Sequence, residues 1–175
     1  GQLQGPIEKY NWMYCVDAQV AGEGLAEPPV STLPRHDLEG QIGQHPTEPN
    51  PYRWIGGFGH ELGHNLGFTF HADSQRSIMA GGYLMYPNCN LTQREVNIVS
   101  GNPNSYKPSC RLVYLVPSDQ NPGPDNEYKI RSAFKEISNW FGQASQLQRT
   151  PRLYEPCELV TVRTDHLADW YVRNP

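Results

Sequence analysis

Two hydrophobic periods alternate along the chain, and each predicts a different kind of secondary structure. Aromatic and β-branched residues crowd residues 10–16, and an apolar run fills residues 111–116, so both segments are predicted strands. Residues 158–164 have the same character and predict a third strand. A shorter stretch at Val30–Leu33 predicts a small strand at the edge of a sheet.

Apolar residues at helical spacing predict a long amphipathic helix over residues 126–145. A second helix is expected over residues 52–65, after a proline-rich segment, and a third over residues 91–100. Residues 33–40 are expected to form a structured loop. The apolar stripe of the long helix consists of Ile130, Ala133, Phe134, Ile137, Phe141 and Ala144.

The last three predicted elements along the chain are the strand at residues 111–116, the helix at residues 126–145 and the strand at residues 158–164. Such a βαβ unit is expected to cross over right-handed and to pair its two strands in parallel. The elements together predict an α+β domain, in which a twisted mixed sheet is backed by a long helix.

The composition narrows the class of protein. A chain of 175 residues is expected to form a single domain, residues 1–175, and its 16 glycines and 16 prolines predict many loops. The net charge of −4 argues against a nucleic-acid binder. No run of about 18 apolar residues is present that would span a membrane. No signal peptide precedes Gly1, so a mature or trimmed form is expected.

The helix over residues 52–65 carries the residues of a metal site. His60 and His64 are four residues apart, so both imidazoles lie on one helix face and can bind one cation. Imidazole ligands at this spacing favour zinc. Glu61, beside the first histidine, can reach a water on that cation and act as general base.

Three later residues extend the motif. Gly67 can end the helix and turn the chain back towards the metal, and His71 then follows as a third imidazole. Met79 lies in the segment Ser77-Ile78-Met79-Ala80-Gly81, which looks like a Met-turn. In this order the residues resemble the active site of the metzincin zinc peptidases. The resemblance implies a metzincin-like fold in which the helix over residues 52–65 is the active-site helix.

The chain departs from the metzincin pattern at the third ligand. The family places that histidine where this chain has Phe70, and His71 comes one residue later. The loop therefore has to bulge by one residue to bring His71 to the metal. Asp73 is the nearest substitute, since some metzincins use aspartate at this point.

The resemblance implies a monomeric zinc endopeptidase that acts on protein or peptide substrates. One catalytic zinc is expected on His60, His64 and His71, with a fourth position for water. Glu61 would take the proton of the water and return it to the leaving amine. Met79 would pack beneath the ligands without binding the metal.

The resemblance also suggests how a substrate binds. A peptide would lie extended along an edge strand, for which Val30–Leu33 is the candidate. Tyr83 and Tyr86 are candidates to donate a hydrogen bond to the oxyanion of the substrate. The sequence gives no indication of a structural Ca²⁺. Three histidines outside the motif are expected to be surface or loop residues: His36, His45 and His166.

Three other interpretations of the motif stay open. The first is a helix with two surface histidines and an acidic neighbour. The second is a gluzincin, in which a distant glutamate is the third ligand; Glu95 is the nearby candidate, but residues 92–95 read as a capping box. The third is a metzincin-like domain that binds peptides with little or no catalysis, because its third ligand is displaced.

The order of the segments differs from that of the metzincins. In that family the βαβ unit opens the catalytic domain, whereas here it comes last. Moving residues 110–175 in front of residue 1 restores the family order, so the chain resembles a circular permutant with residues 102–109 as the joining loop. Two alternatives are a metzincin with a C-terminal extension and a residue order that differs from the covalent order.

The four cysteines suggest an oxidising compartment. None of them has the spacing of a zinc knuckle or a redox motif, and their even number predicts two disulfides in a secreted protein. The favoured pairs are Cys89–Cys110 and Cys15–Cys157, with buried reduced thiols as the alternative.

Overall fold

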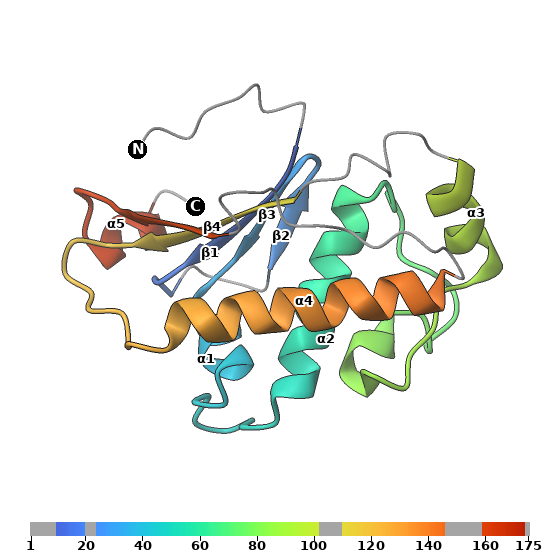
Figure 1. Ribbon diagram of the computed structural model, residues 1–175, viewed down its shortest axis with the longest axis horizontal. Coiled ribbons are helices and arrows are strands. Elements are labelled where there is room, and N and C mark those ends of the chain that lie inside the picture. Colours follow the sequence, from blue (N-terminus) through green and yellow to red (C-terminus); the bar gives the residue numbers. More distant parts are fainter. Residues whose placement is uncertain (1–9, 20–23, 102–109, 146–158, 174–175) are drawn as a thin grey trace.

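The fold is known from a computed structural model, which describes residues 10–19, 24–101, 110–145 and 159–173. Within them five strands form one mixed sheet in the order β2-β3-β1-β4-β5 (Figure 1). Strand β2 is antiparallel to β3, and the other neighbours are parallel. The strands are β1 (Asn11–Val16), β2 (Leu25–Glu27), β3 (Val30–Leu33), β4 (Cys110–Val116) and β5 (Leu159–Arg163).

The structure confirms the predicted strands and corrects one position. β1, β3 and β4 lie where they were expected, and β5 covers all but the last residue of the described part of its predicted range. The expectation that Val30–Leu33 lies at the edge is wrong, because β3 pairs with β1 on one side and with β2 on the other. The edge on this side of the sheet is β2, which runs antiparallel to its neighbour.

Five α-helices and one short 3₁₀-helix accompany the sheet in the described residues. The helices predicted over residues 52–65, 91–100 and 126–145 are confirmed within two residues. The structured loop predicted for residues 33–40 is wrong, because a seven-residue helix starts directly after Pro34. The helices are α1 (Arg35–Gln41), α2 (Pro51–Asn65), η2 (Gly81–Met85), α3 (Gln93–Gly101), α4 (Asn126–Ala144) and α5 (Ala168–Arg173).

Local signals fix both ends of α2, the helix that carries the histidine motif. The side chain of Asn50 caps its start by accepting a hydrogen bond of 3.1 Å from the amide of Tyr52, and Pro51 occupies the first turn. Gly67 follows its end with a φ of 104°, a conformation that favours glycine. The chain can therefore reverse directly after the second histidine.

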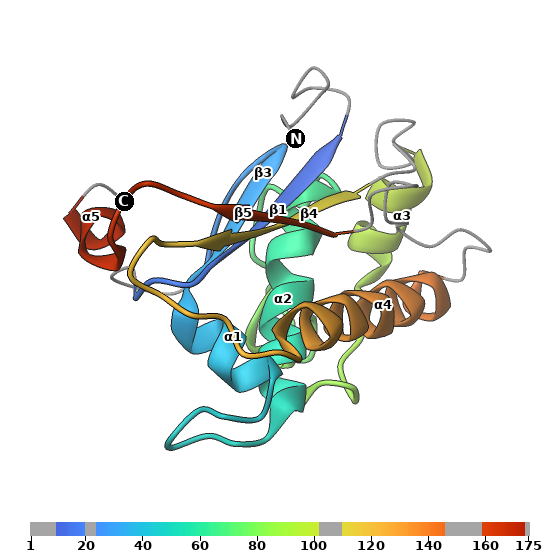
Figure 2. The same cartoon turned by 60° about the vertical axis from the view of Figure 1, so that its left-hand side comes forward.

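The C-terminal segments belong to the same sheet and core as the N-terminal ones. β4 lies between β1 and β5, and the predicted parallel pairing of β4 with β5 is confirmed. Helix α4 crosses α2 on one face of the sheet (Figure 2), where the rings of Phe58 and Phe134 are 5.9 Å apart. The helices approach closely at Gly59, where an added Cβ would come within 2.5 Å of Ile137. The α+β class is thereby confirmed.

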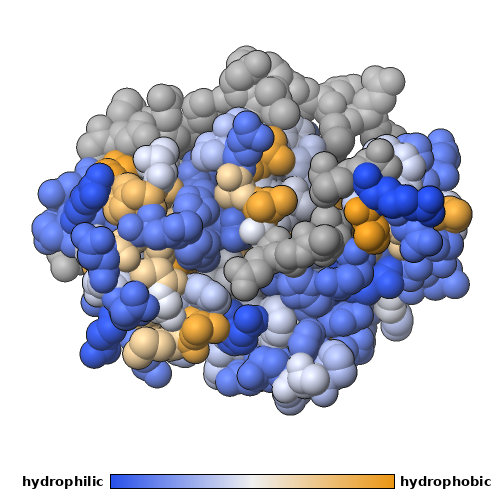
Figure 3. All heavy atoms as spheres, turned by 180° about the vertical axis from the view of Figure 1, so that it is seen from behind, coloured by the Kyte–Doolittle hydropathy of each residue, from blue (hydrophilic) through white to orange (hydrophobic). Residues whose placement is uncertain are grey.

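No described helix is both long enough and apolar enough to cross a membrane. The face of the molecule shown in Figure 3 is largely hydrophilic, and its apolar side chains form small separate groups. Isolated apolar residues of this kind are normal on a protein surface.

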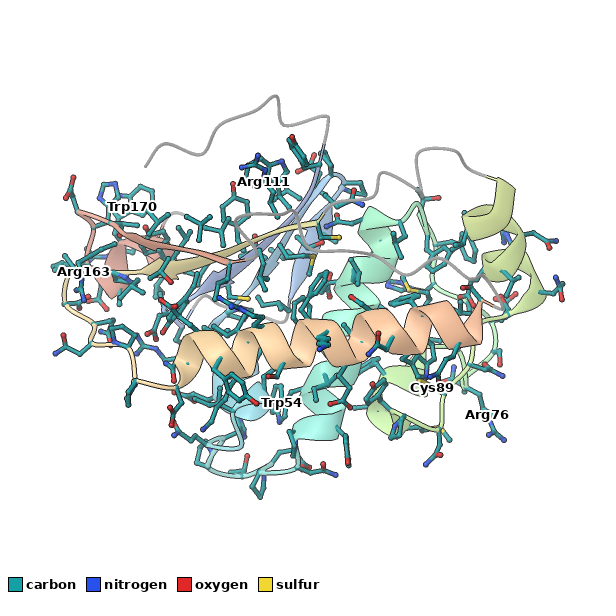
Figure 4. All side chains as sticks on the ribbon, viewed as in Figure 1. Trp54, Arg76, Cys89, Arg111, Arg163 and Trp170 are labelled. Atoms are coloured by element: carbon teal, nitrogen blue, oxygen red, sulfur yellow. The ribbon has the colours of Figure 1, made fainter. Side chains whose placement is uncertain are left out.

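The described cysteines are free thiols, so the predicted Cys89–Cys110 disulfide is wrong, whereas the predicted Cys15–Cys157 pair depends on a residue outside the described part of the chain. Cys15 and Cys110 are buried in the sheet, and Cys89 is half-buried. Figure 4 shows Cys89 and Arg111 on opposite sides of α4 in this view. Cys157 lies outside the described residues. Burial raises the pKa of Cys110 to about 12, so this thiol stays protonated at neutral pH.

Candidate metal centre

Three histidines converge at the C-terminal part of α2. His60 and His64 come from the helix, and His71 comes from the loop that follows Gly67. One ring nitrogen from each histidine lies within 4.8 Å of the other two, so the cluster can hold a metal ion. Asp73 does not belong to this cluster. The one-residue shift of the third histidine is thus accommodated by the fold.

The hydrogen bonds of the two helical histidines direct the same nitrogen of each towards the cluster. Nδ1 of His60 donates to the carbonyl of Ile78 at 2.8 Å, and Nδ1 of His64 donates to that of Phe68 at 2.6 Å. Each Nε2 atom is therefore the unprotonated one in the neutral ring, and the two lie 3.3 Å apart.

The separation of these nitrogens fits zinc. Zinc–nitrogen bonds of about 2.0–2.1 Å at a tetrahedral angle place two ligand nitrogens about 3.3–3.4 Å apart. The Nε2 atoms of His60 and His64 are 3.3 Å apart. A cation between them would also remove the repulsion of two lone pairs that face each other. The spacing of this pair is thus compatible with zinc, and His71 supplies a third imidazole nitrogen within 4.8 Å of both.

Burial keeps one ligand neutral. Desolvation lowers the pKa of His64, the hydrogen bond to the carbonyl of Phe68 opposes this effect, and the nearby His71 lowers the pKa further. The folded protein thus favours the neutral imidazole, which is the form that binds metal.

The loop after Gly67 shows how the extra residue is absorbed. The amide of Phe68 donates to the carbonyl of Gly63 at 3.1 Å, which closes the end of the helix. Phe70, at the family position of the third ligand, lies under the guanidinium of Arg94 at 3.8 Å. With Phe70 held there, the next residue, His71, lies at the cluster.

We expect His71→Ala to lose zinc and Asp73→Ala to keep it, because only the first removes a nitrogen from the cluster. The loss in zinc affinity should exceed about 10- to 100-fold, which is the effect typical of removing a residue that only supports a metal ligand. Zinc content after gel filtration, measured by elemental analysis, compares the two variants. Retention by His71→Ala together with loss by Asp73→Ala would reverse the assignment.

The turn that contains Met79 supports the ligands from below. Met79 is fully buried, and an added Cβ on Gly63 would come within 2.3 Å of its sulfur. The amide of Met79 donates to the hydroxyl of Ser77 at 3.0 Å, and the carbonyl of Ile78 accepts from His60. This turn therefore fixes the orientation of a ligand while its methionine packs against the helix between the two histidines.

Glu95 is engaged elsewhere and does not reach the cluster. Its carboxylate accepts from the amide of Thr92 at 2.5 Å and from the hydroxyl of Ser77 at 2.7 Å. The amide of Glu95 in turn donates to the Thr92 hydroxyl at 3.3 Å, so the predicted capping box is confirmed. The geometry gives no support to Glu95 as a metal ligand.

Glu61 borders the cleft beside the histidines and is 9 % exposed. Its backbone carbonyl accepts from the hydroxyl of Ser31 at 3.0 Å, which ties α2 to β3. Its side chain lies under Gly24, where an added Cβ would be 3.1 Å from Oε1. Gly24, directly before β2, thus leaves space for the carboxylate of Glu61.

The cleft in front of the histidines has a volume of about 480 Å³. The residues from Gly24 to Ala26 form one wall, and α2 forms the floor. The sequence interpretation missed several lining residues, because the fold brings them together from α1, α2 and β2. These are Leu25, His36, Asp37, Arg53, Trp54 and Gly57.

The two candidate tyrosines differ in position. Tyr83 lines the cleft, and its ring lies 5.5 Å from that of His60. Tyr86 is buried and donates to the carboxylate of Glu136 on α4 at 3.2 Å. Of the two, Tyr83 is the one that the structure places at the site.

The other three histidines lie outside the cluster. His45 packs against Trp54, and His166 stacks on Trp170. His36 was expected to be a surface or loop residue, but it lies in α1 and lines the cleft.

Comparison of the chain with protein-family models, curated proteins and solved structures finds no match.

Proposed function

We propose that this protein is a zinc-dependent endopeptidase with a metzincin-like active site. The observation that carries the proposal is the convergence of His60, His64 and His71 beside Glu61, in a cleft walled by the edge of a sheet. Three imidazoles leave one ligand position open, which is the arrangement of a catalytic rather than a structural zinc site.

Each residue of the site has a role in this proposal. The three histidines hold the metal, and a bound zinc ion would lower the pKa of water and polarise a carbonyl group. Glu61 accepts a proton from the attacking water and delivers it to the leaving amine. Tyr83 lines the cleft and is the proposed donor to a substrate oxyanion, whereas the hydroxyl of Tyr86 is bonded to Glu136.

The edge strand offers a binding surface for an extended peptide. β2 borders the cleft through Leu25 and Ala26, and its outer side pairs with no described strand. A peptide added there would make main-chain hydrogen bonds and pass over the histidines. The sequence suggested β3 as the strand that binds the peptide, and we now propose β2 for this role.

The sheet order supports a permuted metzincin domain. The metzincin resemblance requires the βαβ unit to share a sheet with β1, and its long helix to lie beside the active-site helix. β4 pairs with β1 along six residues, and α4 packs on α2. We therefore propose that residues 110–175 form the part of the domain that opens the chain in other metzincins. Residues 102–109, the joining loop in this proposal, lie outside the described residues.

Removal of the metal should abolish hydrolysis reversibly. We expect dialysis against a chelator to lower peptide cleavage to background, because Glu61 alone cannot activate water without the cation. One equivalent of Zn²⁺ should restore activity. The assay is a broad set of peptide and protein substrates, cleaved before chelation, after it and after zinc addition.

A different outcome favours a binding domain. If the protein with one bound zinc cleaves nothing in this set, the peptidase proposal fails. Hydrolysis that persists in excess chelator would also contradict it, because the histidine cluster would then have no part in the chemistry.

A further inference from the structure

The cleft contains a hollow over Gly57, one helical turn before Glu61. An added Cβ on Gly57 would meet one atom within contact range, Oδ1 of Asp37 at 4.0 Å. The space above this glycine is therefore open to a ligand. Gly57 and Glu61 are about 6 Å apart along the helix axis. A side chain next to the reacting bond of a substrate can reach that far.

An acidic group borders one side of the hollow. Asp37 comes from α1, lines the cleft and is 7 % exposed. Nδ1 of His36 accepts from the amide of Gln19 at 2.8 Å, so the proton of the neutral ring resides on Nε2. That Nε2 lies 3.3 Å from Oδ2 of Asp37. His36 thus lies beside one carboxylate oxygen, and the other, Oδ1, is the one nearest to Gly57.

A basic group lines the same cleft. Arg53 precedes Gly57 by one helical turn on the same face of α2, and it lines the same cleft. Its guanidinium lies 4.1 Å above the ring of Trp54, which packs against α1 at Gly40 (Figure 4). Within the described residues Arg53 makes no ion pair. Stacking occupies the face of the guanidinium and leaves its in-plane N–H groups available to a ligand.

We infer that this hollow selects a substrate side chain that ends in a neutral carboxamide, and glutamine in particular. The inference rests on the proposed peptidase function. The carboxamide oxygen accepts from Arg53, and the carboxamide nitrogen donates to Oδ1 of Asp37. The apolar walls from Leu25 and Trp54 contact the methylene groups of the side chain.

Other side chains fit the same pair of charges less well. A glutamate would bring its charge against Asp37, and a lysine would bring its charge against Arg53. An apolar side chain such as methionine would remove water from both charged groups without replacing the lost hydrogen bonds. Sites built to hydrogen-bond a substrate discriminate strongly against analogues that cannot do so.

The test is a matched peptide series that varies the residue on each side of the cleaved bond among glutamine, glutamate, lysine and methionine. We expect glutamine on one side to give the highest kcat/KM, by about tenfold or more. Asp37→Asn should raise the relative rate for glutamate, and Arg53→Met should raise it for lysine. Because the two shifts go in opposite directions, a general loss of stability cannot produce them.

Matched control variants change the same residue types away from the cleft. Asp169→Asn and Arg173→Met alter an exposed pair on α5, and both should leave the glutamine preference unchanged. Binding of the four peptides to zinc-loaded Glu61→Ala protein, measured by calorimetry, gives the ranking without turnover. Glutamine should again bind most tightly.

The outcomes separate this inference from the function on which it rests. Cleavage with a side-chain preference that neither Asp37→Asn nor Arg53→Met alters overturns the inference and leaves the peptidase standing. Equal affinities of glutamine, glutamate and lysine peptides for the Glu61→Ala protein also overturn it. If the wild-type protein cleaves none of the peptides, the proposed function fails, and a glutamine preference in binding would then support the hollow alone.

Discussion

Glu61→Ala is expected to keep its zinc and to lose nearly all hydrolysis. Loss of the general base should lower kcat/KM by about 10²–10⁴-fold, the range typical of acid–base catalysis. The zinc should stay, because the metal cluster consists of the three histidines alone. Zinc content by elemental analysis and kcat/KM on a cleaved peptide are measured on the same preparation.

A matched carboxylate elsewhere serves as the control. Glu127 is exposed at the start of α4, and Glu127→Ala should retain both zinc and activity. Unchanged hydrolysis in Glu61→Ala would contradict the assigned mechanism. Loss of zinc together with activity would show instead that Glu61 is needed to form the site.

Deletion of residues 110–175 is expected to unfold the rest of the chain. It removes β4, whose residues are almost all buried, and leaves β1 without its partner on that side. It also removes four large buried side chains of α4, each contributing about 1.5–3 kcal/mol. Their sum of about 6–12 kcal/mol is comparable to the whole stability of a domain, about 5–15 kcal/mol. These side chains are Ile130, Phe134, Ile137 and Phe141.

The fragment of residues 1–109 should therefore show no cooperative unfolding and bind no zinc at the affinity of the whole chain. Circular dichroism during thermal unfolding and a zinc titration measure both properties. As a positive control, a rearranged chain in which residues 110–175 precede residue 1 should fold and bind zinc. A soluble, cooperative, zinc-binding fragment 1–109 would refute the permutation and favour a C-terminal appendage.

The sequence predicted the elements whose pattern is long or whose caps are strong. The apolar run of β4 and the stripe of α4 are such patterns, because burial on one or both faces imposes their periods. The end of α2 and the capping box of α3 depend on side chains within a few residues, so local reasoning identified them. Elements of this kind need no knowledge of the tertiary fold.

Short elements and pairings were predicted poorly. α1 has seven residues and follows a proline, and β2 has three residues, so neither carries a full hydrophobic period. The position of β3 inside the sheet depends on β2, which the sequence did not indicate. The predicted Cys89–Cys110 disulfide was wrong because cysteine number and spacing do not give the distance between two thiols.

The residues of the candidate site also fall into two groups, those that the local sequence predicted and those that only the fold brings together. His60, Glu61 and His64 are fixed relative to one another by the helix period, so the sequence alone placed them together. His71 required a turn at Gly67, which glycine at that position suggested. Arg53 and Asp37 come from two different helices, and no sequence pattern links them. The fold alone brings their charges to the same cleft.

The most direct test of the proposed zinc site is anomalous scattering at the zinc absorption edge from a crystal of the zinc-loaded protein. We expect one peak bonded to the Nε2 atoms of His60, His64 and His71, with one ligand position left for water or substrate. The absence of a peak at the cluster, or a peak bound by Asp73 in place of His71, would contradict it.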